Sequence, residues 1–121
     1  MARILIIDDD QDILDFTTSC LESSHTVTTA MNGEEGMVAC EKGHFDLILT
    51  DIFMPYRDGL DIIREVRTLY PSIKIIAMTS HVGEGMTDYL KAAELIGAHA
   101  KLEKPLTPEI VVECVDAVLN N

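Results

Sequence analysis

Positive charge is scarce in this chain of 121 residues, which carries 9 Lys and Arg against 21 Asp and Glu, for a net charge of -12. Binding to nucleic acid or to an anionic membrane surface depends on clustered cations. The composition therefore argues against nucleic acid and membranes as direct partners, and it favours a metal cation or a basic protein face.

Long apolar runs are also missing. The longest, such as residues 4–7 and 47–49, are far shorter than the roughly 20 residues that span a bilayer. The first residues lead directly into a strand-like run and acidic residues, without the apolar region and cleavage site of a signal peptide. We expect no transmembrane segment and a cytoplasmic location.

Three further absences narrow the class of protein. Cys20, Cys40 and Cys114 are widely spaced and form no CxxC pair, which is typical of small buried thiols. A GxxxxGK motif is absent, which excludes ATP use as in a P-loop enzyme. No repeat, low-complexity segment or linker interrupts the chain, so we expect one domain over residues 1–121.

What the chain does contain is a regular alternation of strand-like and helix-like segments. Several of the apolar runs are almost continuous, as in parallel strands that are covered on both faces, whereas the polar stretch 25–29 suits an edge strand. This predicts an α/β fold with a doubly wound parallel sheet of five strands and five helices. The expected strands are residues 4–7, 27–30, 47–49, 73–78 and 98–102.

Apolar residues at helical spacing assign the inward faces of the helices. Among the residues expected to face the core are Leu69 in the third helix, Tyr89 in the fourth and Ile110 in the fifth. The helix starts are marked by residues that can cap them. The expected caps are Asn32 with Glu35, Asp58, and Thr107 followed by Pro108.

Polar residues follow the expected strands, at the edge of the sheet where ligands of doubly wound folds bind. They are Asp8 and Asp9 after the first strand, Asp51 after the third, Thr79 and Ser80 after the fourth, and Lys104 after the fifth. If the first and third strands are neighbours, the carboxylates lie about 5 Å apart, and each ionised pair costs roughly 3 kcal/mol at an effective dielectric constant of 20. Protonation, Lys104 or a hard divalent cation can relieve this repulsion, and Mg²⁺ (or Mn²⁺) is the favoured candidate.

The same residues contain the parts of a phosphoryl acceptor. Asp51 would be the nucleophile, Lys104 would hold one phosphoryl oxygen, and Thr79 would donate a hydrogen bond to another. Asp10 and Asp12, in contrast, fit the solvated start of a helix.

Four segments together resemble the response-regulator receiver domain of two-component signalling. They are ILIIDDDQDIL at residues 4–14, DLILTDIFMPYRDGLDIIREVR at 46–67, IKIIAMTS at 73–80 and KLEKPL at 101–106. Each motif is weak alone, but the ordered set DD, D-x-x-MP-x-x-DG, TS and KP is specific, and the resemblance covers essentially the whole chain.

The resemblance implies a flavodoxin-like fold with strand order 2-1-3-4-5. It implies that Asp8 and Asp9 bind Mg²⁺ directly or through water, that the backbone carbonyl of Phe53 completes the metal shell, and that a histidine-kinase phosphohistidine phosphorylates Asp51. The implied partners are a sensor histidine kinase or a histidine phosphotransfer protein, and a downstream effector protein or output domain. Such a domain is no ordinary enzyme, because it catalyses only its own phosphorylation and dephosphorylation. The peptide bond before Pro105 is commonly cis in this family.

Two features depart from the family pattern or vary within it, one at Lys101 and one at Phe53 with His81. Three residues before Lys104, where the family usually has Tyr or Phe, this chain has Lys101. We expect Lys101 to stay solvated, with the signal read from the phosphorylated site or the adjacent loops. Phe53 and His81 are expected at the rim of the site, where the apolar Phe53 would shield the acyl phosphate and slow its hydrolysis.

Two other functions use the same residues. A Mg²⁺-dependent phosphohydrolase acting on small molecules would also form an aspartyl phosphate. However, Asp51 is followed by Ile52 and Phe53, with no second acid two residues on, and the length leaves no room for a cap domain. A receiver-like scaffold that is never phosphorylated is the other alternative. The intact set of acids, Thr79 and Lys104 argue against it, although Lys101 keeps it open.

Overall fold

The computed structural model describes residues 1–54, 59–79 and 86–121. Its strands form a parallel sheet in the order β2-β1-β3-β4-β5, which confirms the predicted α/β fold and strand order. The strand that contains most of the polar stretch 25–29 lies at an edge of the sheet, as its composition indicated. The strands are β1 (Arg3–Ile7), β2 (Thr26–Ala30), β3 (Leu47–Asp51), β4 (Lys74–Thr79) and β5 (Ala100–Glu103).

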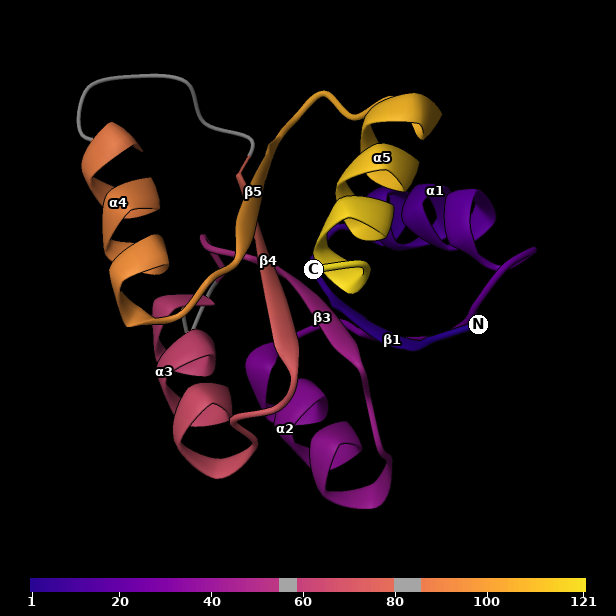
Figure 1. Ribbon diagram of the computed structural model, residues 1–121. Coiled ribbons are helices and arrows are strands. Elements are labelled where there is room, and N and C mark those ends of the chain that lie inside the picture. Colours follow the sequence, from indigo (N-terminus) through magenta and orange to yellow (C-terminus); the bar gives the residue numbers. More distant parts are fainter. Residues whose placement is uncertain (55–58, 80–85) are drawn as a thin grey trace.

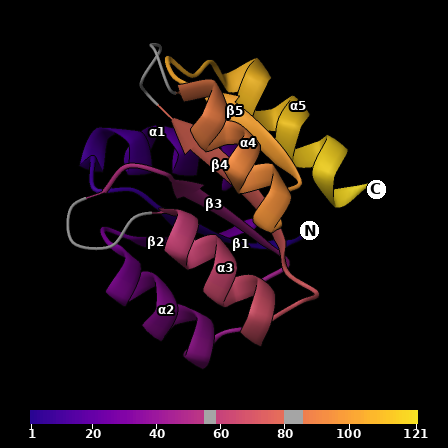
Figure 2. The same ribbon diagram turned by 90° about the vertical axis from the view of Figure 1, so that its left-hand side faces the viewer.

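Helices cover both faces of the sheet. Figures 1 and 2 show α1 and α5 on one face and α2, α3 and α4 on the other. Each strand is followed in the chain by one helix, as right-handed βα crossovers require. The helices are α1 (Gln11–Leu21), α2 (Gly33–Lys42), α3 (Gly59–Leu69), α4 (Met86–Ile96) and α5 (Pro108–Leu119).

The two central strands carry the core. Side chains of β1 and β3 alternate between the two faces, so Leu5 and Ile48 pack with α2, α3 and α4, whereas Ile4 and Leu47 pack with α1 and α5. All four side chains are completely buried. Because β1 and β3 are covered on both faces, their ends are held firmly, and these ends carry the acidic residues of interest.

Two of the predicted helix caps form as expected. The Asn32 side chain accepts a hydrogen bond from the Glu35 backbone N–H at 2.8 Å, and the Glu35 carboxylate accepts one from the Met31 N–H. Thr107 caps α5 in the same way, with Pro108 as the first helical residue. The predicted cap Asp58 lies outside the described residues.

Three residues predicted to face the core are instead exposed: Leu69 by 56%, Tyr89 by 45% and Ile110 by 44%. Leu69 is the last residue of α3, and the next residue, Tyr70, packs against the core in its place. Ile110 and Tyr89 each precede a buried residue, Val111 and Leu90, and the rotation of about 100° per residue turns them to the margin of the inward face.

The cysteines are free thiols, with Cys40 buried and Cys20 and Cys114 partly buried. Among the helices in the described parts of the chain, none is long and apolar enough to cross a membrane.

Candidate functional site

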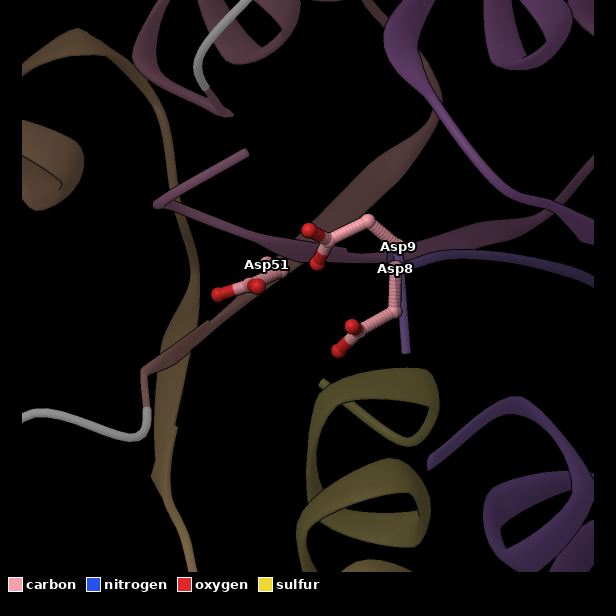
Figure 3. Close-up of side chains that lie close together, drawn as sticks. All are labelled: Asp8, Asp9 and Asp51. Atoms are coloured by element: carbon pink, nitrogen blue, oxygen red, sulfur yellow. The ribbon is translucent and has the colours of Figure 1, made fainter. Parts of the chain in front are cut away.

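Strand pairing brings the acidic residues together. β1 and β3 are neighbours, with Ile7 opposite Thr50, so Asp8 and Asp51 follow at the same edge of the sheet. One carboxylate oxygen from each of Asp8, Asp9 and Asp51 lies within 4.8 Å of the others. Figure 3 shows the three carboxylate groups turned toward a common space.

Lys104 reaches this cluster from the chain that leaves β5. Its Nζ lies 2.8 Å from Asp8 Oδ2 and 3.7 Å from Asp51 Oδ2. The Lys104 backbone N–H donates to the carbonyl of Thr79 at 2.7 Å, which ties this segment to the end of β4. The Lys104–Pro105 peptide bond is cis, as the family resemblance implied.

Burial sets the electrostatics of the two inner carboxyl groups. Asp51 is only 4% exposed, and this burial raises its pKa to about 6, against the lowering effect of Lys104 and with a further increase from the charge of Asp8. Burial also raises the pKa of Asp8, while its hydrogen bond with Lys104 acts in the opposite direction. Asp9 is exposed. Among the described residues of the site, one ammonium group thus faces three carboxyl groups, which gathers more negative than positive charge in a small space.

Backbone hydrogen bonds orient the carboxylates. Asp8 Oδ1 accepts from the Asp10 N–H at 2.9 Å, and Asp51 Oδ1 accepts from the Phe53 N–H at 3.3 Å. The side chain of Asp10 accepts from the Asp12 N–H and caps α1, which agrees with the structural role expected for both residues.

Gly59 is a residue whose role the sequence reasoning missed, although it stands in the DG pair of the quoted motif. A Cβ atom at this position would lie 2.2 Å from the Asp51 carbonyl oxygen and 2.7 Å from the Ile52 Cα. The start of α3 therefore packs directly on the backbone of Asp51, and the Gly59 N–H donates to the Ile52 carbonyl. The signal in the sequence was a glycine at the start of a helix, where Ala would be the better helix former.

The remaining predicted residues lie around the cluster. Thr79 is buried at the end of β4, next to the strand that carries Asp51. Phe53, two residues after Asp51, is 39% exposed. On β5, Lys101 keeps a half-exposed side chain and lies 3.6 Å from Glu94 of α4, in agreement with its expected solvation. Ser80 and His81 lie outside the described residues.

This arrangement has a clear chemical capacity. Several carboxylate oxygens lie close together here, and such oxygens are the ligands that Mg²⁺ prefers. A buried carboxylate next to a cation and a hydroxyl-bearing residue has the groups needed to take up and stabilise a phosphoryl group. Because the carboxylates come from β1 and β3, the site depends on the tertiary fold and not on one local motif.

Comparison with known proteins supports the same conclusion. The sequence matches the profile of the response regulator receiver domain over residues 4–116. It is 38% identical over 112 residues to the probable C4-dicarboxylate response regulator DctR of Halalkalibacterium halodurans, and 35% identical over 107 residues to the response regulator receiver protein Anae109_2439 of Anaeromyxobacter sp.. These matches cover 90% and 88% of this chain, but 47% and 44% of those proteins, so the chain spans about half the length of the curated relatives it matches.

A solved structure gives the same result for the fold. The crystal structure of a CheY-like response regulator receiver domain protein from Methanospirillum hungatei superposes with a TM-score of 0.91 at 31% identity, and the match covers 99% of this chain and 94% of that one. With the profile match, this shows that the chain belongs to the family of response regulator receiver domains of two-component systems.

Proposed function

We propose that this receiver domain accepts a phosphoryl group on Asp51 from a phosphohistidine, in a reaction that depends on Mg²⁺ or Mn²⁺. The donor would be a sensor histidine kinase or a histidine phosphotransfer protein. The observation that supports this most strongly is the convergence of Asp8, Asp9 and Asp51 within 4.8 Å, with Lys104 beside them.

The residues around the cluster suit a divalent cation. Asp8, Asp9 and Asp51 would hold the ion through carboxylate oxygens, with the backbone carbonyl of Phe53 as a further ligand. When bound, the ion supplies positive charge that neutralises the crowded carboxylates and the oxygens of the incoming phosphoryl group. Lys104 now contacts Asp8 more closely than Asp51, so the two inner acids already share one cation.

The proposed chemical step is a direct transfer. An Asp51 carboxylate oxygen attacks the phosphorus atom of the phosphohistidine, a P–O bond forms as the P–N bond breaks, and the bonding electron pair returns to the imidazole nitrogen. Lys104 would balance the charge on one phosphoryl oxygen, and Thr79 would donate a hydrogen bond to another. Water later hydrolyses the acyl phosphate. The domain would therefore catalyse only its own phosphorylation and dephosphorylation.

The phosphorylated domain would act through an effector protein or an output domain. A phosphoryl group adds negative charge and hydrogen-bond acceptors, which bias the loops and helices near the site between two arrangements. Lys101 is half exposed and faces Glu94, so an inward movement of an aromatic residue at this position is not available as the readout.

Incubation with a small acyl phosphate and Mg²⁺, followed by intact mass measurement, tests the proposal. We expect one retained phosphoryl group per chain, and none when EDTA replaces Mg²⁺ or when Asp51 is changed to Asn. Continuous release of phosphate without a retained group would support a phosphohydrolase. A chain that never gains mass would support a scaffold.

A further inference from the structure

An aromatic contact joins the loop after Asp51 to α4. The rings of Phe53 and Tyr89 have centroids 4.9 Å apart and planes inclined at 69°, an edge-to-face arrangement. Both side chains are partly exposed, by 39% and 45%. The contact therefore lies at the surface beside the site, where a ring can change position without a rearrangement of the buried core.

Phe53 is tied directly to the proposed phosphoacceptor. Its backbone N–H donates to Asp51 Oδ1 at 3.3 Å, so a change in the charge or position of this carboxylate acts directly on Phe53 as well as on Lys104. The preceding residue, Ile52, is almost completely buried, and its backbone is packed against the start of α3. A displacement at Asp51 therefore passes more easily to the exposed Phe53 ring than to the core.

Helix α4 is anchored at its far end. After α4, Gly97 adopts φ +133°, and its carbonyl accepts from Arg67 at 3.0 Å. Arg67 also donates to the carbonyls of Pro71 and Ile73, so this guanidinium joins the segments that follow α3 and α4. Tyr89 lies eight residues before Gly97, or about 12 Å along the helix axis. A pivot at the Gly97 end would thus move the Tyr89 ring.

Few of the α4 side chains that the structure describes are buried. Leu90 and Ala93 are the buried ones, and the helix packs beside α3 (Figure 2). Toward β5, α4 has the half-exposed ion pair between Glu94 and Lys101, which is weak in water. Among the side chains of α4 that the structure describes, Tyr89 is the one in ring contact with the loop that follows Asp51.

We propose that the Phe53–Tyr89 contact couples the phosphorylation state of Asp51 to the position of α4, with Tyr89 as a positioning residue that acts through Phe53. The inference rests on the proposed phosphorylation of Asp51 and names the element that reports it. In this chain, the coupling runs from the end of β3 to α4 through two rings in edge-to-face contact, whereas Lys101 on β5 supplies a cation.

Hydrogen exchange of the α4 backbone amides, with and without beryllofluoride and Mg²⁺ as a phosphoryl mimic, tests this coupling. Tyr89→Leu and Phe53→Leu remove one ring each from partly exposed positions, and Tyr89→Phe is the matched control that keeps the ring. The free energy of an aromatic pair corresponds to roughly a 2- to 13-fold change in an equilibrium constant. We expect beryllofluoride to change exchange in wild-type α4, and this change to fall by a factor in that range in both Leu variants but not in Tyr89→Phe.

Binding of beryllofluoride is measured separately, by calorimetry, so that the two proposals can fail independently. If wild type and variants bind it equally and α4 responds equally in all of them, or does not respond in wild type, the coupling is refuted while the proposed function stands. If wild type does not bind it at all, the proposed function fails and the coupling fails with it.

Discussion

The two central strands and the α4–β5 region of this domain are held in different ways. β1 and β3 are buried on both faces, and their ends place Asp8 and Asp51 with little freedom. Among its described residues, the α4–β5 region has fewer buried side chains, including Leu90, Ala93 and Leu102, and β5 pairs only with β4. It is further held by a surface ring contact, a half-exposed ion pair and the Arg67 guanidinium. The comparison indicates that the chemistry depends on a rigid edge, whereas the response is expected where few buried contacts must be broken.

Gly59→Ala, at the start of α3 where it packs on the end of β3, should destabilise the domain more than the other substitutions below. The added Cβ would lie 2.2 Å from the Asp51 carbonyl oxygen, which is backbone and cannot turn away. We expect a loss of about 3 kcal/mol or more in the free energy of unfolding, measured in urea. Gly36→Ala is the matched control, because the nearest atoms to its Cβ belong to the Ile7 side chain and not to backbone, with Cδ1 at 2.5 Å and Cγ1 at 3.1 Å, and it should cost less. Equal losses would show that α3 does not press on the Asp51 backbone.

Asp51→Asn tests the electrostatics of the buried acidic groups at the ends of β1 and β3. The pKa of Asp51 is about 6 in the folded protein and 3.8 as its ordinary value, so between these pH values the folded state binds more protons than the unfolded state. The stability of the wild type should therefore fall as pH rises from 4 to 6, by roughly 3 kcal/mol at most.

The Asn variant should lack the part of this fall that comes from Asp51 and be more stable than wild type at pH 7 in EDTA, as measured by urea unfolding between pH 4 and pH 8. Addition of Mg²⁺ should recover stability in wild type more than in the variant. The same pH dependence in both proteins would show that Asp51 is not the group that titrates.

Arg67→Ala tests the anchor of α4. The guanidinium donates to the carbonyls of Pro71, Ile73 and Gly97, and its loss should lower the free energy of unfolding by roughly 1–3 kcal/mol. Arg64→Ala is the control, because Arg64 forms an exposed pair with Asp61 that should contribute roughly 0–0.5 kcal/mol. A smaller loss of unfolding free energy in Arg67→Ala than in Arg64→Ala would show that Arg67 does not anchor α4.

Lys101→Ala should have the smallest effect. The Lys101–Glu94 pair is half exposed at 3.6 Å, and such pairs typically contribute less than about 1 kcal/mol. We expect unchanged phosphate uptake and a change in the urea midpoint close to the error of the measurement. In a companion variant, Lys101→Tyr, unaltered phosphorylation with a strongly altered affinity for the effector would show that the β5 position takes part in the readout.

The sequence was sufficient for the architecture because β1 and β3 are read from almost continuous apolar runs, and because acids at strand ends meet wherever the strands are neighbours. The sequence was not sufficient to predict the exposure of Leu69, Tyr89 and Ile110. Their helical spacing places them on the inward face, but their burial depends on where the helix ends and on how it is rotated against the sheet. Tyr89 was read as a core residue, and only tertiary structure shows that it contacts Phe53. The role of Gly59 was equally hidden, since it arises from the approach of α3 to the backbone of β3.

The most direct test of the account is the site of modification. After incubation with a small acyl phosphate and Mg²⁺, the chain would be digested and its fragments sequenced by mass spectrometry. The account predicts a single phosphoryl group on Asp51, the carboxyl group at the end of β3. A phosphoryl group on Asp8, Asp9 or any other residue, with Asp51 unmodified, would contradict it.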